Sequence, residues 1–384
     1  VLKRLNPAVA VQDLGFQCEF LATPELEAGE LLKRGYRAFV LPCSIALSAR
    51  EIEALCAYVE KGGLVMADGW AGLMDEHCKP YAQRAADGLF GVKRGAANLG
   101  AAQAEGRAVF STDQGDCRLK GVAYDVSVAE KDLAAGPGKP LGAHGAAPLG
   151  IVNRAGDGAA VFLNAFMDAY PQRRSLGIEE PLRRVAEGLL LLRGIRPVVG
   201  VSIEATPRAY ALINRFESGG AGIVTAVMNW EGKAADWSAP ISLDLPKAGQ
   251  VYDLRKGAWV GETNKVRTSL LAGDAALYAV LPARVTGVKV GASPAQARAG
   301  DAVAVTAQVV STAPMAWRHA LRFEVRGPDG AVVPHYGGVI AADGGKGQSG
   351  LVLALNDAPG RWTVTVKDVV SGLKGEASFV LAQP

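Results

Sequence analysis

Two residues stand where an α/β protein usually places its chemistry, directly after an apolar run. Cys43 ends the run 37–43 (RAFVLPC), and Asp68 ends the run 64–68 (LVMAD). Open α/β sheets bind ligands outside the carboxyl ends of their strands, so both side chains are candidates. Cys43 could be an activated thiolate, and Asp68 could be a base or hold a ligand. The alternatives are a thiol packed in a turn and a turn-forming aspartate.

The segment after Asp68 adds two further pocket candidates, Trp70 and His77, although the distance from His77 to Cys43 cannot be read from sequence. Residues 75–78 (DEHC) offer four metal-ligand types in a row. Adjacent side chains point apart and cannot all reach one ion, so we expect no metal site. Neither GxGxxG after a strand nor GxxxxGK[ST] is present, and GxSxG is also missing, so we expect no cofactor and no such catalytic serine.

A second possible chemistry is sugar binding by aromatic residues of the β-rich half. Four tryptophans there could stack on sugar rings as a platform. An aromatic residue in a β-protein is more often part of the core, so both interpretations stay open. The four are Trp230, Trp237, Trp259 and Trp317, of which we take the first three as candidate sugar-stacking residues.

The first 200 residues alternate helix and strand signals. Helix starts are indicated by capping residues and early prolines near positions 6, 23, 48 and 179, and helix ends by the glycines that follow. The apolar runs between the helices, 16–21, 37–43 and 64–68, are continuous, as expected of strands buried on both faces. Strands joined by single helices imply right-handed crossovers and a parallel sheet. Composition predicts a loop over 133–150, and 148–153 with 159–164 are expected to form a hairpin.

From about residue 200 the apolar residues recur at every second position. Residues 209–216 and 222–228 predict a hairpin, within a small β-sandwich or partial barrel. After Pro282, alternating runs such as 303–309 and 362–366 predict about seven short strands. This pattern indicates an immunoglobulin-like sandwich without the cysteine pair of antibody domains. We therefore expect three domains, at 1–200, 201–283 and 284–384.

Composition excludes several function classes. The 384 residues are 49% hydrophobic and 21% charged, with 41 basic and 38 acidic side chains, which argues against disorder and against a nucleic-acid partner. The apolar stretches are too short for a membrane span. The chain starts at Val1, so we expect that a leader was removed or that it belongs to something longer. The five cysteines leave the compartment undecided, and we favour an extracytoplasmic or secreted location over the cytoplasm.

Several segments together resemble a known family. Residues 35–77, 148–166 and 182–197 are similar to the glutamine-amidotransferase-like domain of bacterial, trimer-forming β-galactosidases, where it is called the trimerisation domain. Residues 251–282 resemble the small β-domain that follows it. The order of these segments, over most of 15–283, is more specific than any one of them. The resemblance implies a multidomain chain, with an α/β flavodoxin-like sheet followed by two all-β domains.

The resemblance also bears on catalysis. In active amidotransferases of this fold the strand corresponding to 64–68 ends in a nucleophilic cysteine, whereas this chain has Asp68. A carboxylate cannot form the thioester intermediate of glutamine hydrolysis. In the β-galactosidases, hydrolysis belongs to a (β/α)8 barrel that carries two glutamates, and the three expected domains leave no room for one.

Three hypotheses follow, in order of preference. In the first, the chain is a non-catalytic oligomerisation or accessory region of a β-galactosidase-like glycoside hydrolase. It is then expected to be homo-oligomeric, a trimer by analogy, and to work with a catalytic barrel of the same protein or of another subunit. Alternatively, it is a carbohydrate-binding module. A third possibility is a hydrolase that uses Cys43 or Asp68.

Overall fold

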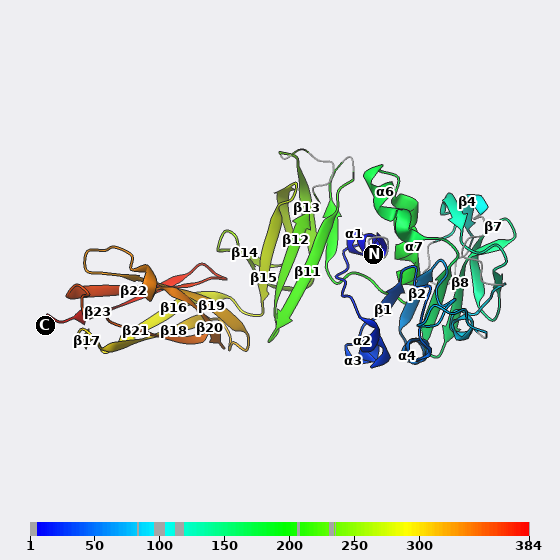
Figure 1. The fold of residues 1–384 in the computed structure, drawn as a ribbon. Helices are drawn as coiled ribbons and strands as arrows, with labels where there is room; N and C mark the ends of the chain where they lie inside the picture. Colours follow the sequence, from blue (N-terminus) through cyan, green and yellow to red (C-terminus); the bar gives the residue numbers. More distant parts are fainter. Residues whose placement is uncertain are drawn as a thin grey trace. The chain divides into compact units, whose positions relative to one another are not determined.

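The structure is a computed structural model that describes residues 6–82, 84–95, 104–111, 119–205, 208–229, 234 and 236–383. It divides into two compact units. The first contains Val1–Val198 with Thr206–Tyr210, and the second Val199–Ala205 with Ala211–Pro384. Strands predominate over helices in both Figure 1 and the element order, so the chain is multidomain and mostly β. In the described ranges no helix combines the length and apolar character needed to cross a membrane.

The first unit is built on one mixed seven-stranded sheet. Its order is β1-β2-β9-β8-β7-β4-β5. The first three strands in this order are parallel, and each later pair is antiparallel. The strands are β1 (Ala38–Leu41), β2 (Leu64–Asp68), β4 (Ala104–Phe110), β5 (Ala123–Val128), β7 (Lys139–His144), β8 (Ala147–Ala155) and β9 (Gly158–Leu163); β3 (Val92–Lys93) and β6 (Ala134–Ala135) form a separate pair.

Helices cover both faces of this sheet. Leu64 and Met66 of β2 belong to one core, with α1 (Asn6–Asp13) and α7 (Glu180–Leu191). Val65 and Ala67 belong to the other, with side chains from the remaining helices before β3. Neighbouring strand residues point to opposite faces, which is why a continuous apolar run suits a sheet covered on both sides. The helices of the second core are α2 (Thr23–Glu27), α3 (Glu30–Lys33), α4 (Ala49–Glu60) and α5 (Ala85–Phe90).

The expected helix starts are confirmed. At α4 the Ser48 hydroxyl accepts the N–H of Glu51 at 3.1 Å, and the Glu51 carboxylate accepts the N–H of Ser48 at 2.7 Å. This reciprocal pair satisfies two N–H groups that the first turn of a helix leaves without partners. The helix expected from residue 23 is interrupted at Gly29, which adopts a left-handed conformation and separates α2 from α3.

The strand expected at 16–21 is wrong, because these residues are irregular coil. Phe16 packs against the first core and Leu21 against the second, whereas Phe20 is 68% exposed. An apolar run becomes a strand only when a neighbouring strand accepts its backbone hydrogen bonds. In the described part of the first unit, β1 pairs with β2 alone and is the edge of the sheet.

The loop expected over 133–150 is also wrong, because the segment contains β6, β7 and the start of β8. Leu141 in β7 is fully buried. A Cβ at Gly142 would lie 2.5 Å from the Val109 carbonyl oxygen of β4, so the glycine allows a close approach of two strands. The composition suggested a turn, but here glycine serves strand packing. The parallel sheet expected for this unit is correct only for β1, β2 and β9, whereas the expected β8–β9 hairpin is confirmed.

The second unit begins with an antiparallel sheet of order β10-β13-β15-β12-β11, with β14 paired to β13. The hairpin expected at 209–228 is confirmed as β11 and β12, in a register that pairs Ala211 with Met228 and Ser218 with Ala221. The strands are β10 (Gly200–Ile203), β11 (Ala211–Ser218), β12 (Ala221–Met228), β13 (Ser238–Asp253), β14 (Ala258–Leu271) and β15 (Ala275–Leu281).

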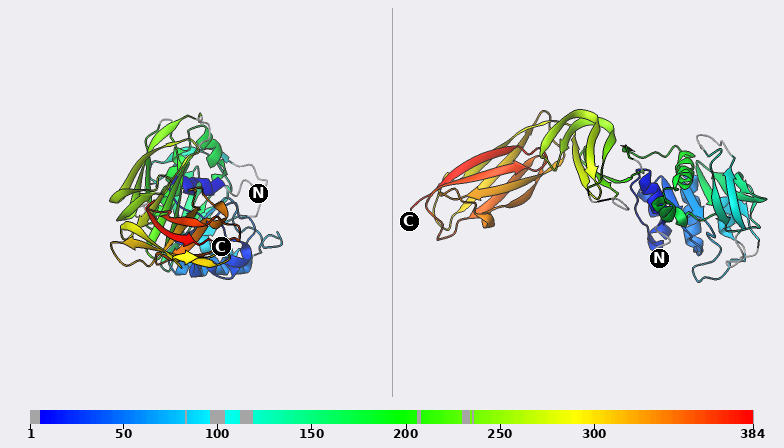
Figure 2. Two further views of the ribbon diagram at one scale, coloured as in Figure 1. Left: turned by 90° about the vertical axis from the view of Figure 1, so that its left-hand side faces the viewer. Right: turned by 90° about the horizontal axis from the view of Figure 1, so that it is seen from above.

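The remaining strands form one eight-stranded sheet of order β16-β18-β21-β20-β19-β22-β23-β17, drawn as a separate array in Figure 2. The expected alternation is confirmed: Val303 and Val305 of β18 and Val364 of β22 are fully buried. The strands are β16 (Val285–Ser293), β17 (Gln296–Ala297), β18 (Ala302–Ser311), β19 (Arg318–Arg326), β20 (Gly338–Asp343), β21 (Lys346–Val352), β22 (Gly360–Asp368) and β23 (Lys374–Leu381).

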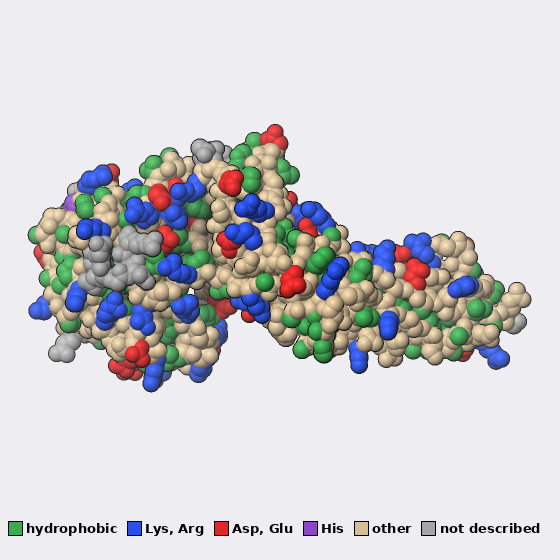
Figure 3. Space-filling view, turned by 180° about the vertical axis from the view of Figure 1, so that it is seen from behind, with side chains coloured by type: hydrophobic (Ala, Val, Ile, Leu, Met, Phe, Trp, Pro, Cys, Tyr) green, Lys and Arg blue, Asp and Glu red, His purple; other side chains and the backbone are tan. Residues whose placement is uncertain are grey.

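Basic side chains are spread over the face shown in Figure 3, and acidic side chains lie among them. This distribution agrees with the small net charge of +3.

Candidate functional site at the carboxyl ends of the parallel strands

Asp68 lies at the carboxyl end of β2 and is only 5% exposed. Its Oδ1 accepts the backbone N–H of Cys43 at 2.6 Å, and its Oδ2 accepts the backbone N–H of Met167 at 2.9 Å. Met167 opens the short 3-10 helix η2 (Met167–Ala169), which follows β9. The carboxylate therefore joins the segments that follow three neighbouring parallel strands.

The backbone around Asp68 turns sharply. Cys43 has a φ of +45°, a left-handed conformation that is uncommon for a residue with a side chain. Gly69 has a φ of +63°, and a Cβ there would lie 2.0 Å from the Phe166 ring. Only glycine fits that position, so β2 ends in a tight elbow closed by an aromatic ring.

Trp70 closes the same region. Its ring lies edge-on against Phe166 with 5.0 Å between centroids, and its Nε1–H donates to the Ala129 carbonyl at 3.1 Å. Asn164, directly after β9, is fully buried. Its Nδ2 donates to the carbonyls of Glu130 and Pro148, and its Oδ1 accepts the N–H of Glu130. The asparagine therefore fixes the chain that leaves β5.

Beside this site lies a buried ionic cluster of Arg94, Asp87 and Glu130. The Arg94 side chain is fully buried, its Nη1 donates to the Ala71 carbonyl at 2.7 Å, and its guanidinium lies 4.4 Å from the centre of the Phe162 ring. Its Nε lies 3.5 Å from both Asp87 Oδ1 and Glu130 Oε1, too far or too oblique for a hydrogen bond. The cluster thus holds opposite charges together but leaves Nε and Nη2 of Arg94, Oδ1 of Asp87 and Oε1 of Glu130 without hydrogen-bond partners.

The electrostatics of this cluster follow from its burial. Burial raises the pKa of Asp87 and of Glu130, against the opposing effect of the nearby Arg94 guanidinium. Burial also lowers the pKa of Arg94. Each charged form loses water on folding and regains only part of that energy from its neighbours.

Among the described residues, His77 forms no hydrogen bond or ion pair with these groups. It lies in a surface turn, its side chain is 73% exposed, and its Nε2 is 4.0 Å from the neighbouring Glu76. Asp75 organises the turn by accepting the N–H groups of His77 and Lys79, both at 2.9 Å. Within the described ranges, no group of three or more His, Cys, Asp or Glu residues is arranged to hold a metal ion.

The described tryptophans of the second unit differ in their exposure and in their contacts. Trp259 is 42% exposed, but the Arg284 guanidinium lies 3.8 Å from the centre of its ring, and its Nε1–H donates to Gln250 at 3.0 Å. Trp237 is half-buried. Trp317, for which a platform role and a core role were both open, is only 3% exposed and belongs to the core. Trp230 lies outside the described residues.

Two cysteines outside the site are poor nucleophiles. Burial raises the pKa of Cys18 to about 11, and burial followed by the charges of Glu60 and Glu53 raises the pKa of Cys56. A thiol with a raised pKa carries little thiolate at neutral pH.

The structure therefore brings together Cys43, Asp68 and Trp70, whereas His77 lies in an exposed turn without a bond to them. Sequence reasoning missed Arg94, Glu130 and Asn164. Asn164 could have been found, because it ends the predicted strand 159–164 just as Asp68 ends its own strand. Nothing local marked Arg94 as buried, since two of its neighbours, Ala71 and Glu130, lie in distant segments.

Comparison with known proteins gives fold-level likeness only. No protein-family model matches the chain, and no curated protein matches it. Among solved structures, the β-galactosidase from Bacillus circulans sp. alkalophilus has a TM-score of 0.52 and 15% identity, over 72% of this chain and 36% of its own. A catalytic mutant of Gan42B, a GH42 β-galactosidase from G. stearothermophilus, has a TM-score of 0.52 and 13% identity, over 72% and 35%. About 72% of this chain thus shares its fold with a part of these proteins that is about a third of their length.

Proposed function

We propose that this chain is a non-catalytic accessory region of a β-galactosidase-like glycoside hydrolase. One observation carries the proposal: both oxygens of the buried Asp68 carboxylate accept backbone N–H groups at the strand end where amidotransferases, which the sequence resembles, have a thiol. A carboxylate held in this way serves structure, because each of its oxygens accepts a backbone N–H and its exposure is low. The fold shared with part of two β-galactosidases supports the same assignment.

In this proposal the first unit is a glutamine-amidotransferase-like, flavodoxin-like domain that associates with copies of itself, as a trimer by analogy. The exposed apolar side chains of Leu176 and Ile178, 66% and 51% exposed, support self-association. They lie between α6 (Tyr170–Ser175) and α7. Exposed apolar side chains that lie close together are typical of surfaces that bind another protein. The last sheet is proposed to be immunoglobulin-like, and hydrolysis is assigned to a catalytic barrel that is part of the same protein or of another subunit.

The carbohydrate-binding alternative has less support. A sugar ring needs an open aromatic face, and Arg284 lies over the ring of Trp259. Trp317 is buried and cannot contribute to a platform.

Two measurements on the purified chain test the proposal. The first is hydrolysis of a chromogenic β-galactoside, with Asp68→Asn and Cys43→Ser as variants; we expect no turnover. Turnover that either substitution removes would overturn the non-catalytic assignment. The second is molar mass in solution by sedimentation, with Leu176→Glu combined with Ile178→Lys. We expect an oligomer that the double variant converts to monomer, and a monomeric wild-type chain at micromolar concentration would overturn the oligomerisation role.

A further inference from the structure

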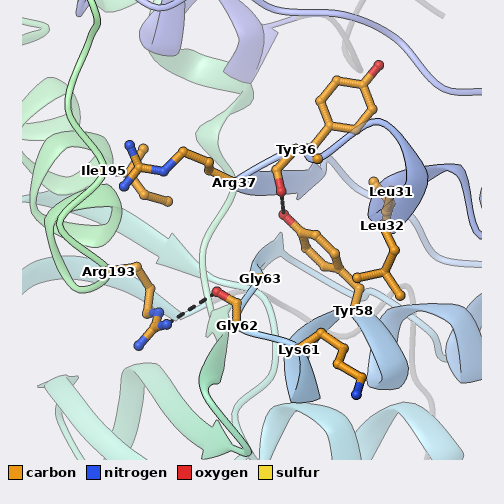
Figure 4. A pocket seen from close by; sticks show the side chains of 11 residues that line it. Leu31, Leu32, Tyr36, Arg37, Tyr58, Lys61, Gly62, Gly63, Arg193 and Ile195 are labelled. Carbon is orange, nitrogen blue, oxygen red and sulfur yellow. Dashed lines mark hydrogen bonds between the residues drawn. The ribbon is translucent and has the colours of Figure 1, made fainter.

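A cavity of about 410 Å³ lies in the first unit at the amino ends of β1 and β2, opposite the edge that holds Asp68. Its size falls within the range of small-molecule sites. Figure 4 shows that the lining comes from distant segments. They are the end of α3 and the residues before β1, the residues between α4 and β2, and the chain that leaves α7: Leu31, Leu32, Gly35, Tyr36, Arg37, Tyr58, Lys61, Gly62, Gly63, Arg193 and Ile195.

The charges of this cavity are all of one sign. Arg37, Lys61 and Arg193 line it, and no acidic residue does. No carboxylate of the described residues forms an ion pair with any of these three cations, and the acid that lies close by is Asp157, whose Cβ lies beside Gly62 as Arg193 Nη2 does. Elsewhere in the unit cations are paired, as Arg34 is with Glu25 and Glu30. Like charges that share one concave surface repel each other and create a positive potential that attracts an anion.

The two arginines are held in place by the backbone. Arg37 Nη2 donates to the Gly194 carbonyl at 3.3 Å, and Arg193 Nη2 donates to the Gly62 carbonyl at 3.3 Å. In Figure 4 both guanidinium groups lie on the side of the cavity near Ile195, and the end of the Lys61 side chain points away from them. Each bond uses one N–H of a five-donor group, which leaves the others for a ligand.

Arg193 supplies a second observation that points to a ligand. Its Nε is buried and has no hydrogen-bond partner. A charged donor that loses water without a partner is costly, and the negative charge of an anion held by the accessible part of the guanidinium would offset that cost without touching Nε. A guanidinium matches the spacing of oxygens in phosphate, sulfate and carboxylate groups.

We propose that this cavity binds a small oxyanion, either free or as the anionic group of a sugar phosphate, through Arg37 and Arg193, with Lys61 at the rim. The volume leaves room for part of an organic molecule beside the anionic group. The proposal does not depend on the role assigned to Asp68, which lies at the other edge of the sheet.

Titration calorimetry of the full chain at constant ionic strength tests the proposal, with inorganic phosphate in one arm and galactose 6-phosphate in the other. We expect saturable binding of one anion per chain in at least one arm. Equal affinities in both arms identify a site for the free anion, and about tenfold tighter binding of the sugar phosphate identifies a site for an anionic sugar.

The variants locate the site. Arg37 is exposed, so Arg37→Ala should leave the fold intact and weaken binding about tenfold; Arg193→Gln, which keeps a hydrogen-bonding side chain, should do the same. The matched control removes two other exposed cations, Arg184 and Arg196, from a cavity that also contains Glu180 and Glu187. Arg184→Ala with Arg196→Ala should leave the affinity within about twofold. No saturable binding in either arm, or an equal loss in the control, would overturn the proposal.

Discussion

Asp68 and Cys43, 25 residues apart in sequence, are joined by a 2.6 Å hydrogen bond from the backbone N–H of Cys43 to the Asp68 carboxylate. The aspartate that could have been a catalytic base is therefore an acceptor for the turn that carries the candidate nucleophile. The same carboxylate binds the N–H of Met167. The two residues that the sequence suggested as catalytic candidates are thus parts of one hydrogen-bonded turn.

Replacing Asp68 with Ala should destabilise the first unit by about 3 kcal/mol, because two backbone N–H groups lose a charged acceptor inside the protein. Asp68→Asn keeps one acceptor oxygen and should cost about half as much. Calorimetric unfolding measures both effects. Asp75→Ala is the control, because the Asp75 carboxylate also accepts two backbone N–H groups but is exposed to water. Its loss should therefore destabilise the unit less. Equal effects at Asp68 and Asp75 would contradict the structural role.

The buried pair of Arg94 with Asp87 and Glu130 predicts a pH-dependent variant. Arg94→Met should cost about 3–5 kcal/mol at pH 8, because two buried carboxylates lose the stronger of their two positive neighbours, Arg94 and Arg84. Arg94 opposes the rise that burial causes in the pKa of both acids, so its removal raises the two folded-state pKa values further, and the folded variant takes up protons at higher pH than the folded wild type does. The difference in free energy of unfolding between wild type and Arg94→Met should therefore shrink as pH falls from 8 to 5. Unfolding at both pH values measures this change, and Arg184→Met is the control; a difference independent of pH would contradict the account.

A buried chain of hydrogen bonds in the second unit predicts a different pH dependence. Trp317 Nε1–H donates to His319 Nε2 at 2.8 Å, so the ring proton of His319 is on Nδ1, which donates to Asp368 at 2.7 Å. Ser371 also donates to Asp368 from its hydroxyl and its backbone N–H. Burial alone would raise the pKa of Asp368, but the bonds from His319 and Ser371 outweigh it and leave the pKa lowered.

A carboxyl whose pKa is lower in the folded than in the unfolded protein stabilises the fold at pH values above its unfolded-state pKa, about 3.9 for an aspartate. This stabilisation is lost as the pH falls through the folded-state pKa. Asp368→Asn should therefore destabilise the second unit most at pH 7, by about 2–3 kcal/mol, and progressively less below pH 4. Urea unfolding at pH 7, 4 and 3 gives the comparison. A difference between variant and wild type that grows towards low pH would refute this assignment.

Two glycines should respond oppositely to alanine. At Gly142 an added Cβ would lie 2.5 Å from the Val109 carbonyl oxygen and 2.8 Å from the Phe110 Cα, so strands β4 and β7 must separate. Gly142→Ala should cost about 1–3 kcal/mol. At Gly88, inside α5, the Cβ would meet nothing within 4 Å, and Gly88→Ala should stabilise by about 0.5–1 kcal/mol. The melting temperature of the first unit distinguishes the two, and an unchanged value for Gly142→Ala would show that the strands adjust freely.

The sequence by itself determined local structure. The capping pair of Ser48 and Glu51 specified where α4 begins, and alternation along residues 303–309 specified the buried face of β18. Such signals depend on neighbours within a few residues, so they can be read from the sequence wherever the tertiary contacts agree with them. The sequence also placed Asp68 at a strand end, which made it a candidate.

The tertiary structure alone decided the rest. Residues 16–21 lack a strand neighbour and are coil, whereas β7 formed from a glycine-rich segment because its backbone fits closely against β4. The engagement of Asp68 by Cys43 and Met167, and the shared cavity of Arg37 and Arg193, join segments about 25 to 156 residues apart. Contacts over such separations depend on the folding of the whole unit, and no periodicity in the chain records them.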